Sequence, residues 1–321
     1  MTMHGLAAIA ETLRASRGIA AKADIALVAR RLGISGASAV PAGDDCAAIP
    51  DGDSFLLLAI EGFINEFVAA DPWFAGWCGV MVNVSDIAAM GGRPIAAVDA
   101  VWCAGEAQAD PLLGGLAAAS ATFGVPLVGG HSNLRTDRPQ LSVAILGRAK
   151  RLLTSFDAQP GEHLVAAIDL RGRYRDPVPN WEAATDAPAE RLRGDLELLP
   201  SIAEAGLSAA AKDISQGGIV GTAMMLAECS RAGLTIDLDA IPRPEGVALD
   251  LWLRTFPSFG YLLTVAPPNL PATLAHFAAR GIRAASVGLV EDGHRVDVRQ
   301  GDACETIWDF SRQALLGCAD A

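Results

Sequence analysis

The sequence has few of the features that mark secreted, zinc-binding or membrane-spanning proteins. Its six cysteines (46, 78, 103, 229, 304 and 318) include no Cys-x-x-Cys pair, which argues against a zinc site and a disulfide framework. No apolar run is long enough to span a bilayer. The first residues contain no basic leader, and Glu11 and Arg14 interrupt their apolar stretch. We therefore expect a cytoplasmic protein.

The chain also has fewer basic than acidic residues. The chain has 25 Lys and Arg against 37 Asp and Glu, which gives a net charge of −12. This excess of negative charge argues against nucleic acid or an anionic membrane as a partner. The 321 residues, 51% of them hydrophobic, are more than one typical core requires. We expect two domains, 1–149 and 150–321, because basic residues and a Pro-Gly turn interrupt the pattern near residue 150.

The apolar pattern predicts an α+β fold in both halves. In the first half we expect two short helices within 6–32, strands at 46–49 and 54–60, a helix at 72–90, a strand at 94–103, a helix at 110–123, and strands at 125–128 and 141–147. In the second half we expect strands at 164–169, 210–214, 234–238, 260–265, 285–290 and 295–299, helices at 189–205, 218–232, 246–254 and 269–280, and a polar loop at 171–188. Asp71 is the expected N-cap of the helix at 72–90.

Acidic residues adjoin two apolar strands. Asp44 and Asp45 follow Gly43 just before the first strand, and Glu61 follows the apolar run 54–60. Neighbouring carboxylates beside apolar structure are costly unless a partner neutralises them, and few basic residues are nearby. A divalent cation is one solution. A polar turn at Gly43, and a strand that simply reaches water at Glu61, are the alternatives.

Asn83 and Asp86 lie three residues apart on the long helix predicted at 72–90. Side chains at this spacing share a face, so their oxygens can converge on a ligand. A solvated helix face with a hydrogen-bonded Asn explains the pattern equally well.

Two glycine pairs follow strands. Gly129 and Gly130 precede His131, and Gly217 and Gly218 lie between a strand and a helix, flanked by Asp213 and Gln216. Glycines at such places let backbone N–H groups approach phosphate, and a helix N-terminus attracts anions. Neither segment is a P-loop or a dinucleotide fingerprint. A lone histidine such as His131 is more often structural than a ligand.

Taken in order, these segments resemble one family. The sequence contains GDDCAAI, an apolar strand that ends in an acid, VNVSDIAAMGGRP, PLVGGHSN, a PGEHL turn and DISQGG. This series resembles the AIR synthase-related superfamily over about residues 40–300, and VNVSDIAAMGGRP is its most diagnostic segment. The resemblance implies a two-domain AIR synthase-like fold, with an N-terminal mixed α/β domain whose strands form a homodimer and a C-terminal α+β domain. It also implies ATP and Mg²⁺ as cofactors.

The resemblance also assigns roles to residues. It implies that Asp44, Asp45, Glu61, Asn83 and Asp86 bind metal. Nucleotide binding falls to Gly43, Gly129, Gly130, Asp213, Gln216, Gly217 and Gly218, and His131 and Asp45 are the candidate catalytic residues. Two positions depart from the pattern, because His131 stands where thiamine-monophosphate kinase has Asp, and Gln216 replaces an Asp found in several branches. Glu61 also stands where that kinase has Asp.

Three functions are compatible with these residues. The first is an enzyme that uses ATP and Mg²⁺ to phosphorylate or activate a small-molecule acceptor. The second is a degenerate member that binds nucleotide without catalysis, and the third is thiamine-monophosphate kinase itself. The acceptor could contact the arginine-rich segment 171–193, which is equally readable as a solvated surface excursion.

Overall fold

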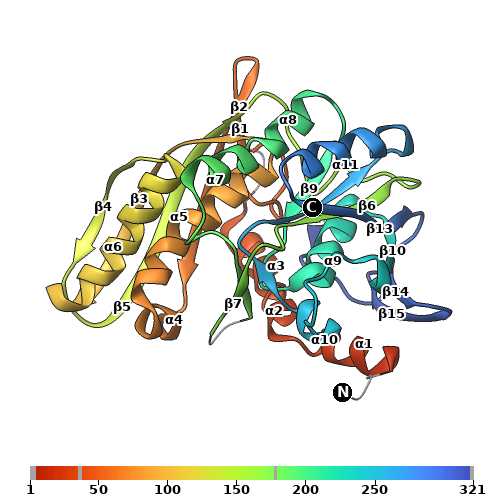
Figure 1. The fold of residues 1–321 in the computed structure, drawn as a ribbon, viewed down its shortest axis with the longest axis horizontal. Helices are drawn as coiled ribbons and strands as arrows, with labels where there is room; N and C mark the ends of the chain where they lie inside the picture. Colours follow the sequence, from red (N-terminus) through yellow and green to blue (C-terminus); the bar gives the residue numbers. More distant parts are fainter. Residues whose placement is uncertain (1–4, 35–37, 177–178, 319–321) are drawn as a thin grey trace. The chain divides into compact units, whose positions relative to one another are not determined.

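The structure is a computed structural model that describes residues 5–34, 38–176 and 179–318. The chain divides into two compact units. The smaller unit contains Asp45–Leu152 and Asp186–Ser201, and the larger unit contains Met1–Asp44, Leu153–Thr185 and Ile202–Ala321. Figure 1 shows the elements of both. The chain thus crosses between the units four times, at Asp44–Asp45, Leu152–Leu153, Thr185–Asp186 and Ser201–Ile202.

The smaller unit is built on a five-stranded sheet with the order β1-β2-β5-β3-β4. The strands are β1 (Ala47–Asp51), β2 (Ser54–Phe63), β3 (Arg93–Ala104), β4 (Leu127–Asn133) and β5 (Arg135–Ala149). Only β3 and β4 pair in parallel among these strands. Along β2, Leu57 and Ala59 are buried while Leu58 and Ile60 are exposed. The sheet therefore has one covered face and one open apolar face.

Two long helices pack on each other beside this sheet, α5 (Pro72–Ala89) and α6 (Glu106–Phe123). A side chain at Gly76 would collide with the Leu112 carbonyl, and one at Gly115 would collide with the Trp73 carbonyl. These glycines let the two backbones approach closely. The Asp71 carboxylate accepts a hydrogen bond from the Phe74 N–H at 3.2 Å, which confirms the expected N-cap. The unit also contains α4 (Asn65–Ala70) and α7 (Ala189–Leu196), and α8 (Leu198–Glu204) begins in it.

The larger unit contains a seven-stranded sheet with the order β15-β14-β10-β13-β6-β12-β9. Its strands are β6 (His163–Ile168), β9 (Ala210–Asp213), β10 (Gly233–Asp237), β12 (Gly260–Val265), β13 (Arg283–Glu291), β14 (Arg295–Gln300) and β15 (Ala303–Asp309). A second, small sheet joins β11 (Phe256–Pro257), β8 (Asn180–Glu182) and β7 (Arg173–Arg175).

The larger unit contains several helices, of which α9 (Gly218–Ser230) is buried along almost its whole length. The others are α1 (Leu6–Arg14), α2 (Arg17–Ala20), α3 (Ala23–Leu32), α10 (Leu249–Trp252) and α11 (Leu270–Ala279), with the 3₁₀ turns η1 (Leu238–Ala240) and η2 (Pro267–Asn269). Ile219, Ala223 and Met224 of α9 belong to the core of this unit. An all-round apolar helix of this kind is typical of a domain centre.

The predicted elements are confirmed in type, and the differences have local causes. Residues 6–32 form three helices, because turns around Ser16 and Lys22 interrupt the apolar pattern. The expected loop 171–188 contains β7 and β8, and the expected helix 246–254 is reduced to α10. The sequence pattern does not predict α4, β11 or β15, and the helix expected at 189–205 is divided into α7 and α8. Among the described helices, none is long and apolar enough to cross a membrane.

Candidate functional site

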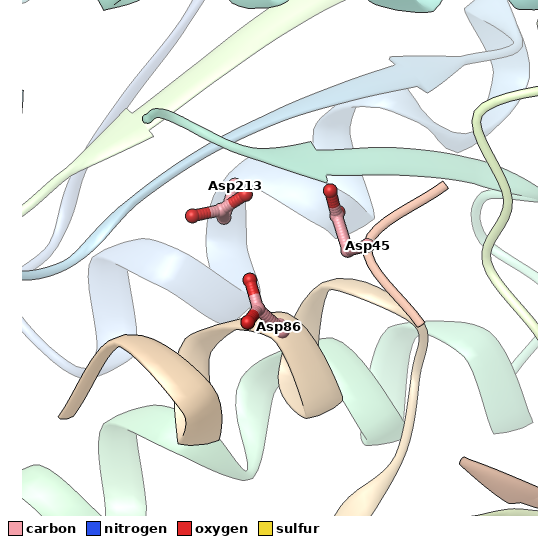
Figure 2. Close-up of side chains that lie close together, drawn as sticks. All are labelled: Asp45, Asp86 and Asp213. Atoms are coloured by element: carbon pink, nitrogen blue, oxygen red, sulfur yellow. The ribbon is translucent and has the colours of Figure 1, made fainter. Parts of the chain in front are cut away.

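Asp45 and Asp86 converge within the smaller unit. Asp45 lies just before β1, and Asp86 is on α5 with only 5% of its surface exposed. One carboxylate oxygen of Asp45 lies within 4.8 Å of one of Asp86, and Figure 2 shows the two side chains. Two carboxylates at this distance repel each other unless a cation or a proton lies between them. The pair is therefore suited to a divalent cation.

Asn83 adds an oxygen one helical turn before Asp86. Its Nδ2 donates a hydrogen bond to the Gly79 carbonyl at 2.8 Å, whereas its buried Oδ1 has no hydrogen-bond partner in the structure. A buried acceptor without a partner is costly. An amide oxygen beside carboxylates is a normal ligand set for Mg²⁺ or Ca²⁺. The unpaired Oδ1 of Asn83 is therefore a suitable additional ligand for a cation bound by Asp45 and Asp86.

Asp44 has a different environment from Asp45. Its carboxylate accepts hydrogen bonds from the Ser155 N–H at 2.9 Å and the Ser155 hydroxyl at 2.7 Å. The buried Lys212 ammonium lies 3.4 Å from both the Ser155 hydroxyl and the Gly43 carbonyl. Ser155 and Lys212 belong with Asp44 to the larger unit. Sequence reasoning missed both, because neither belongs to a recognisable motif.

Glu61 lies inside a strand rather than at its end. The sequence predicts that the strand stops at residue 60, but β2 continues to Phe63, and Glu61 pairs with Val143 of β5. The side chain is half-buried. Among the described residues, Glu61 is not part of the acidic group that contains Asp45 and Asp86.

Gly129, Gly130 and His131 lie in β4, at the edge of the sheet. The strand expected at 125–128 therefore runs on through the glycines to Asn133. A Cβ atom at Gly130 would lie 2.6 Å from Oδ1 of Asp99 on β3, so this glycine accommodates the Asp99 carboxyl. The exposed His131 ring lies 5.7 Å from the Trp102 ring, centre to centre.

Asp99 is an acid that sequence reasoning missed. Burial raises the pKa of its carboxyl, and a backbone hydrogen bond opposes this effect. The sequence predicts its neighbour Gly130 as a phosphate-binding glycine, but it gives no role to Asp99. The signal in the sequence is the single Asp within the apolar strand 94–103.

Asp213 and the glycines that follow it lie at the start of α9 in the larger unit. Asp213 is buried at the end of β9, opposite Tyr261 of β12; Figure 2 labels it as well. Gly218 has φ +65°, and a side chain there would collide with the Leu253 carbonyl. Gly18 packs against the backbone carbonyl of Gln216. Gln216 as a residue is exposed. The turn at 216–218 therefore packs against Gly18 and against Leu253. Helix α9 begins without a side-chain cap.

Several described residues of the segment 171–193 make specific contacts within their own unit. Tyr174 and Trp181 pack edge to face at 5.2 Å, and the Tyr174 hydroxyl lies 2.8 Å from the Thr255 hydroxyl. Arg171 pairs with buried Asp169 in the larger unit. Arg193 donates hydrogen bonds to the Ala121 and Thr122 carbonyls at the end of α6, within the smaller unit. These two arginines therefore have structural partners.

Comparison with known proteins identifies the family. The model for the N-terminal domain of AIR synthase related protein matches residues 43–149, and the model for its C-terminal domain matches residues 178–301. Together they cover more than half of the chain. The chain belongs to the AIR synthase-related family, and the expected resemblance and two-domain α+β fold are confirmed.

The relatives include an uncharacterized protein and an enzyme. The chain is 47% identical over 310 residues to the uncharacterized protein sll0787 of Synechocystis sp., covering 95% of this chain and 96% of the relative. It is 27% identical over 296 residues to thiamine-monophosphate kinase of Pyrococcus abyssi, covering 87% and 92%. The solved structure "AaThiL complexed with AMPPCP and TMP" matches with a TM-score of 0.66 at 19% identity, covering 88% and 95%. At that identity it shows the shared fold.

Proposed function

We propose that this protein is an enzyme that uses ATP and Mg²⁺ to phosphorylate, or activate by phosphorylation, a small-molecule acceptor. The observation that carries the proposal is the convergence of Asp45 and Asp86 in a unit where the buried Oδ1 of Asn83 lacks a partner. Two relatives support it: a thiamine-monophosphate kinase, and a structure whose title names AMPPCP as a ligand.

Asp45, Asp86 and Asn83 would bind the metal, because the two carboxylates lie close together and the buried Oδ1 of Asn83 has no hydrogen-bond partner. A Mg²⁺ ion held there would supply positive charge that stabilises negative charge on the transferred phosphoryl group. Asp44 would take part through the remaining lone pairs of its carboxylate oxygens, since Ser155 already donates to both. Glu61 would assist from β2.

The nucleotide phosphates would bind to backbone N–H groups and polar side chains. We assign this role to Gly43, Gly129, Gly130, Asp213, Gln216, Gly217 and Gly218. The uncapped start of α9 supports the assignment for the last of these, because free N–H groups and the helix dipole attract anions. His131 is exposed and would serve as the general base for the acceptor, with Asp45 at the reacting phosphate.

The test compares ligand stabilisation in wild type and variants. Unfolding temperatures would be measured with ATP, with and without Mg²⁺, in wild type, Asp86→Asn and the matched control Asp137→Asn, whose side chain is exposed. A ligand raises the unfolding temperature only when it is bound. We expect MgATP to stabilise wild type and the control but not Asp86→Asn. Equal shifts in all three proteins would contradict the site.

The second candidate function is nucleotide binding without catalysis. It is favoured by the contact between the exposed His131 ring and Trp102, which gives this residue a structural role on β4. The two functions differ in ATP consumption by the pure protein in the presence of acceptors, thiamine monophosphate among them. Stabilisation by MgATP with no turnover for any acceptor would favour the binding protein.

We also propose a cytoplasmic homodimer. The open face of the five-stranded sheet carries exposed apolar side chains on several strands, namely Ile49, Leu58, Ile60, Ile95, Val98 and Val128. A continuous apolar face of this kind is typical of a surface that another protein covers. A second copy of the same sheet offers the same chemistry. The six cysteines are free thiols, as is usual in the cytoplasm.

A further inference from the structure

Two cysteines from distant parts of the chain meet in the larger unit. Cys229 is near the end of α9, and Cys318 follows β15 in the C-terminal segment. Their sulfur atoms are 2.6 Å apart, both residues are buried, and both are free thiols. A disulfide bond requires an S–S distance of about 2.05 Å, so bond formation here needs only a small displacement.

The residue before Cys229 anchors the C-terminal segment. The buried carboxylate of Glu228 accepts backbone hydrogen bonds from Leu315 at 2.9 Å, Leu316 at 2.5 Å and Gly317 at 3.1 Å. These bonds bring Cys318 onto Cys229 without any cross-link. The two thiols therefore lie close together because the backbone of residues 315–317 is hydrogen-bonded to Glu228.

The cysteine pair also lies against Gly43. A Cβ atom at Gly43 would collide with the Cys318 sulfur and lie 3.2 Å from the Cys229 sulfur, and the Gly43 backbone has φ +123°. The Cys318 thiol donates to the Ala42 carbonyl at 3.7 Å. The segment that leads into Asp44 thus packs directly on both sulfur atoms.

We propose that Cys229 and Cys318 form a reversible intramolecular disulfide when the protein meets a hydroperoxide, and that this bond fixes residues 315–318 to α9. This is a modification site of the larger unit, independent of the proposed phosphoryl transfer. In a reducing compartment the resting state is the dithiol, and cytosolic disulfides are typically transient and redox-sensing.

The chemistry needs a hydroperoxide as oxidant and a dithiol to reverse it. One deprotonated sulfur attacks a peroxide oxygen; the O–O bond breaks, the alcohol or water leaves with a proton, and a sulfenic acid forms. The second sulfur then attacks the first, the S–O bond breaks, and water leaves. Overall, two thiols and one hydroperoxide give a disulfide, water and the alcohol. The two sulfurs supply two electrons to the O–O bond.

The surroundings of Cys229 favour its protonated thiol. The hydrogen bond with Cys318 and burial raise the pKa of Cys229 well above its ordinary value; the charge of Asp44 adds to this effect, and that of Lys212 opposes it. Since the thiolate is the reactive form, we expect slow oxidation and a small oxidant such as hydrogen peroxide as the effective one.

The experiment maps the bond in the wild-type chain. Fully reduced protein would be treated with hydrogen peroxide, alkylated and digested, and its peptides would be identified by mass spectrometry. We expect a cross-linked pair of peptides that contain Cys229 and Cys318, lost again after dithiothreitol. The oxidised protein should unfold at a temperature roughly 5 °C or more higher, because the cross-link closes a long loop.

The controls separate this pair from the other thiols. Cys304→Ser removes an exposed cysteine and should leave the cross-link and the temperature shift unchanged. Cys229→Ser and Cys318→Ser should each abolish both. Recovery of Cys229 and Cys318 as separately alkylated or separately oxidised residues in the wild type would overturn the proposal, whether or not the variants fold.

Discussion

Ser155 donates hydrogen bonds to both oxygens of the Asp44 carboxylate, one from its backbone N–H at 2.9 Å and one from its hydroxyl at 2.7 Å. The next residue, Asp45, instead has an oxygen within 4.8 Å of one of the Asp86 carboxylate. Two neighbouring acids in one motif thus have different neighbours. Ser155 donates to Asp44, whereas a second carboxylate lies close to Asp45.

This difference predicts opposite effects of removing each charge. Asp44→Asn turns one acceptor into an NH₂ group that opposes a Ser155 donor, so we expect a loss of about 1–3 kcal/mol of stability without any ligand. Asp45→Asn relieves repulsion with Asp86, so the metal-free protein should be as stable as wild type or more stable. Urea denaturation without metal measures both. Equal destabilisation by the two variants would contradict the assignment.

Asn83 allows a sharper test of the metal. Asn83→Asp places a third carboxylate beside Asp86, so we expect a lower unfolding temperature without metal and recovery of most of the loss in millimolar Mg²⁺. Asn180→Asp is the matched control, because Asn180 is also buried with an unpartnered Oδ1 but lies in the larger unit. That variant should be destabilised without recovery. Recovery of both, or of neither, would count against a metal at Asn83.

The sequence was sufficient to predict the fold. The apolar spacing of a long segment such as α5 predicts a helix, and Asp71 predicts its N-cap, because both signals are local in the sequence. Partners supplied by distant segments could not be predicted. Ser155 reaches Asp44 across 111 positions, and no local pattern marks it. The pairing of Cys229 with Cys318 depends on how the C-terminal segment folds onto α9, for the same reason.

Glu228 should be one of the most important polar residues for stability. Its buried carboxylate accepts the N–H groups of Leu315, Leu316 and Gly317. Glu228→Ala leaves two buried donors and one partly buried donor without this acceptor, so we expect a loss of about 3 kcal/mol or more. Chemical denaturation measures the loss, with the control Glu245→Ala, at an exposed loop position, expected to stay within about 0.5 kcal/mol. A comparable loss in both variants would show that the anchor does not stabilise the fold.

Asp99 predicts a pH dependence in the smaller unit. Burial raises the pKa of its carboxyl in the folded state, so the folded protein binds this proton more tightly than the unfolded chain. The contribution of Asp99 to stability is therefore present below its ordinary pKa and is lost as pH rises through the raised value. Asp99→Asn, which stays neutral, should raise the unfolding temperature at pH 7 relative to wild type.

The gain from Asp99→Asn should shrink as the pH falls through the raised pKa of Asp99, because the wild-type carboxyl then becomes protonated as well. Unfolding temperatures of both proteins from pH 4 to pH 7 test this difference. A gain that is independent of pH would show that the amide acts through packing beside Gly130 and not through the missing charge.

Ile60 tests the proposed dimer. Its side chain is 69% exposed on the open face of the five-stranded sheet. A charge at this position would be buried without a partner between two copies, so Ile60→Glu should convert a micromolar dimer into monomers. Leu32→Glu is the matched control, because Leu32 is 70% exposed but belongs to α3 in the larger unit. Light scattering measures the mass of each protein. A wild type that is already monomeric, or an Ile60→Glu variant that stays dimeric, would remove this face from the interface.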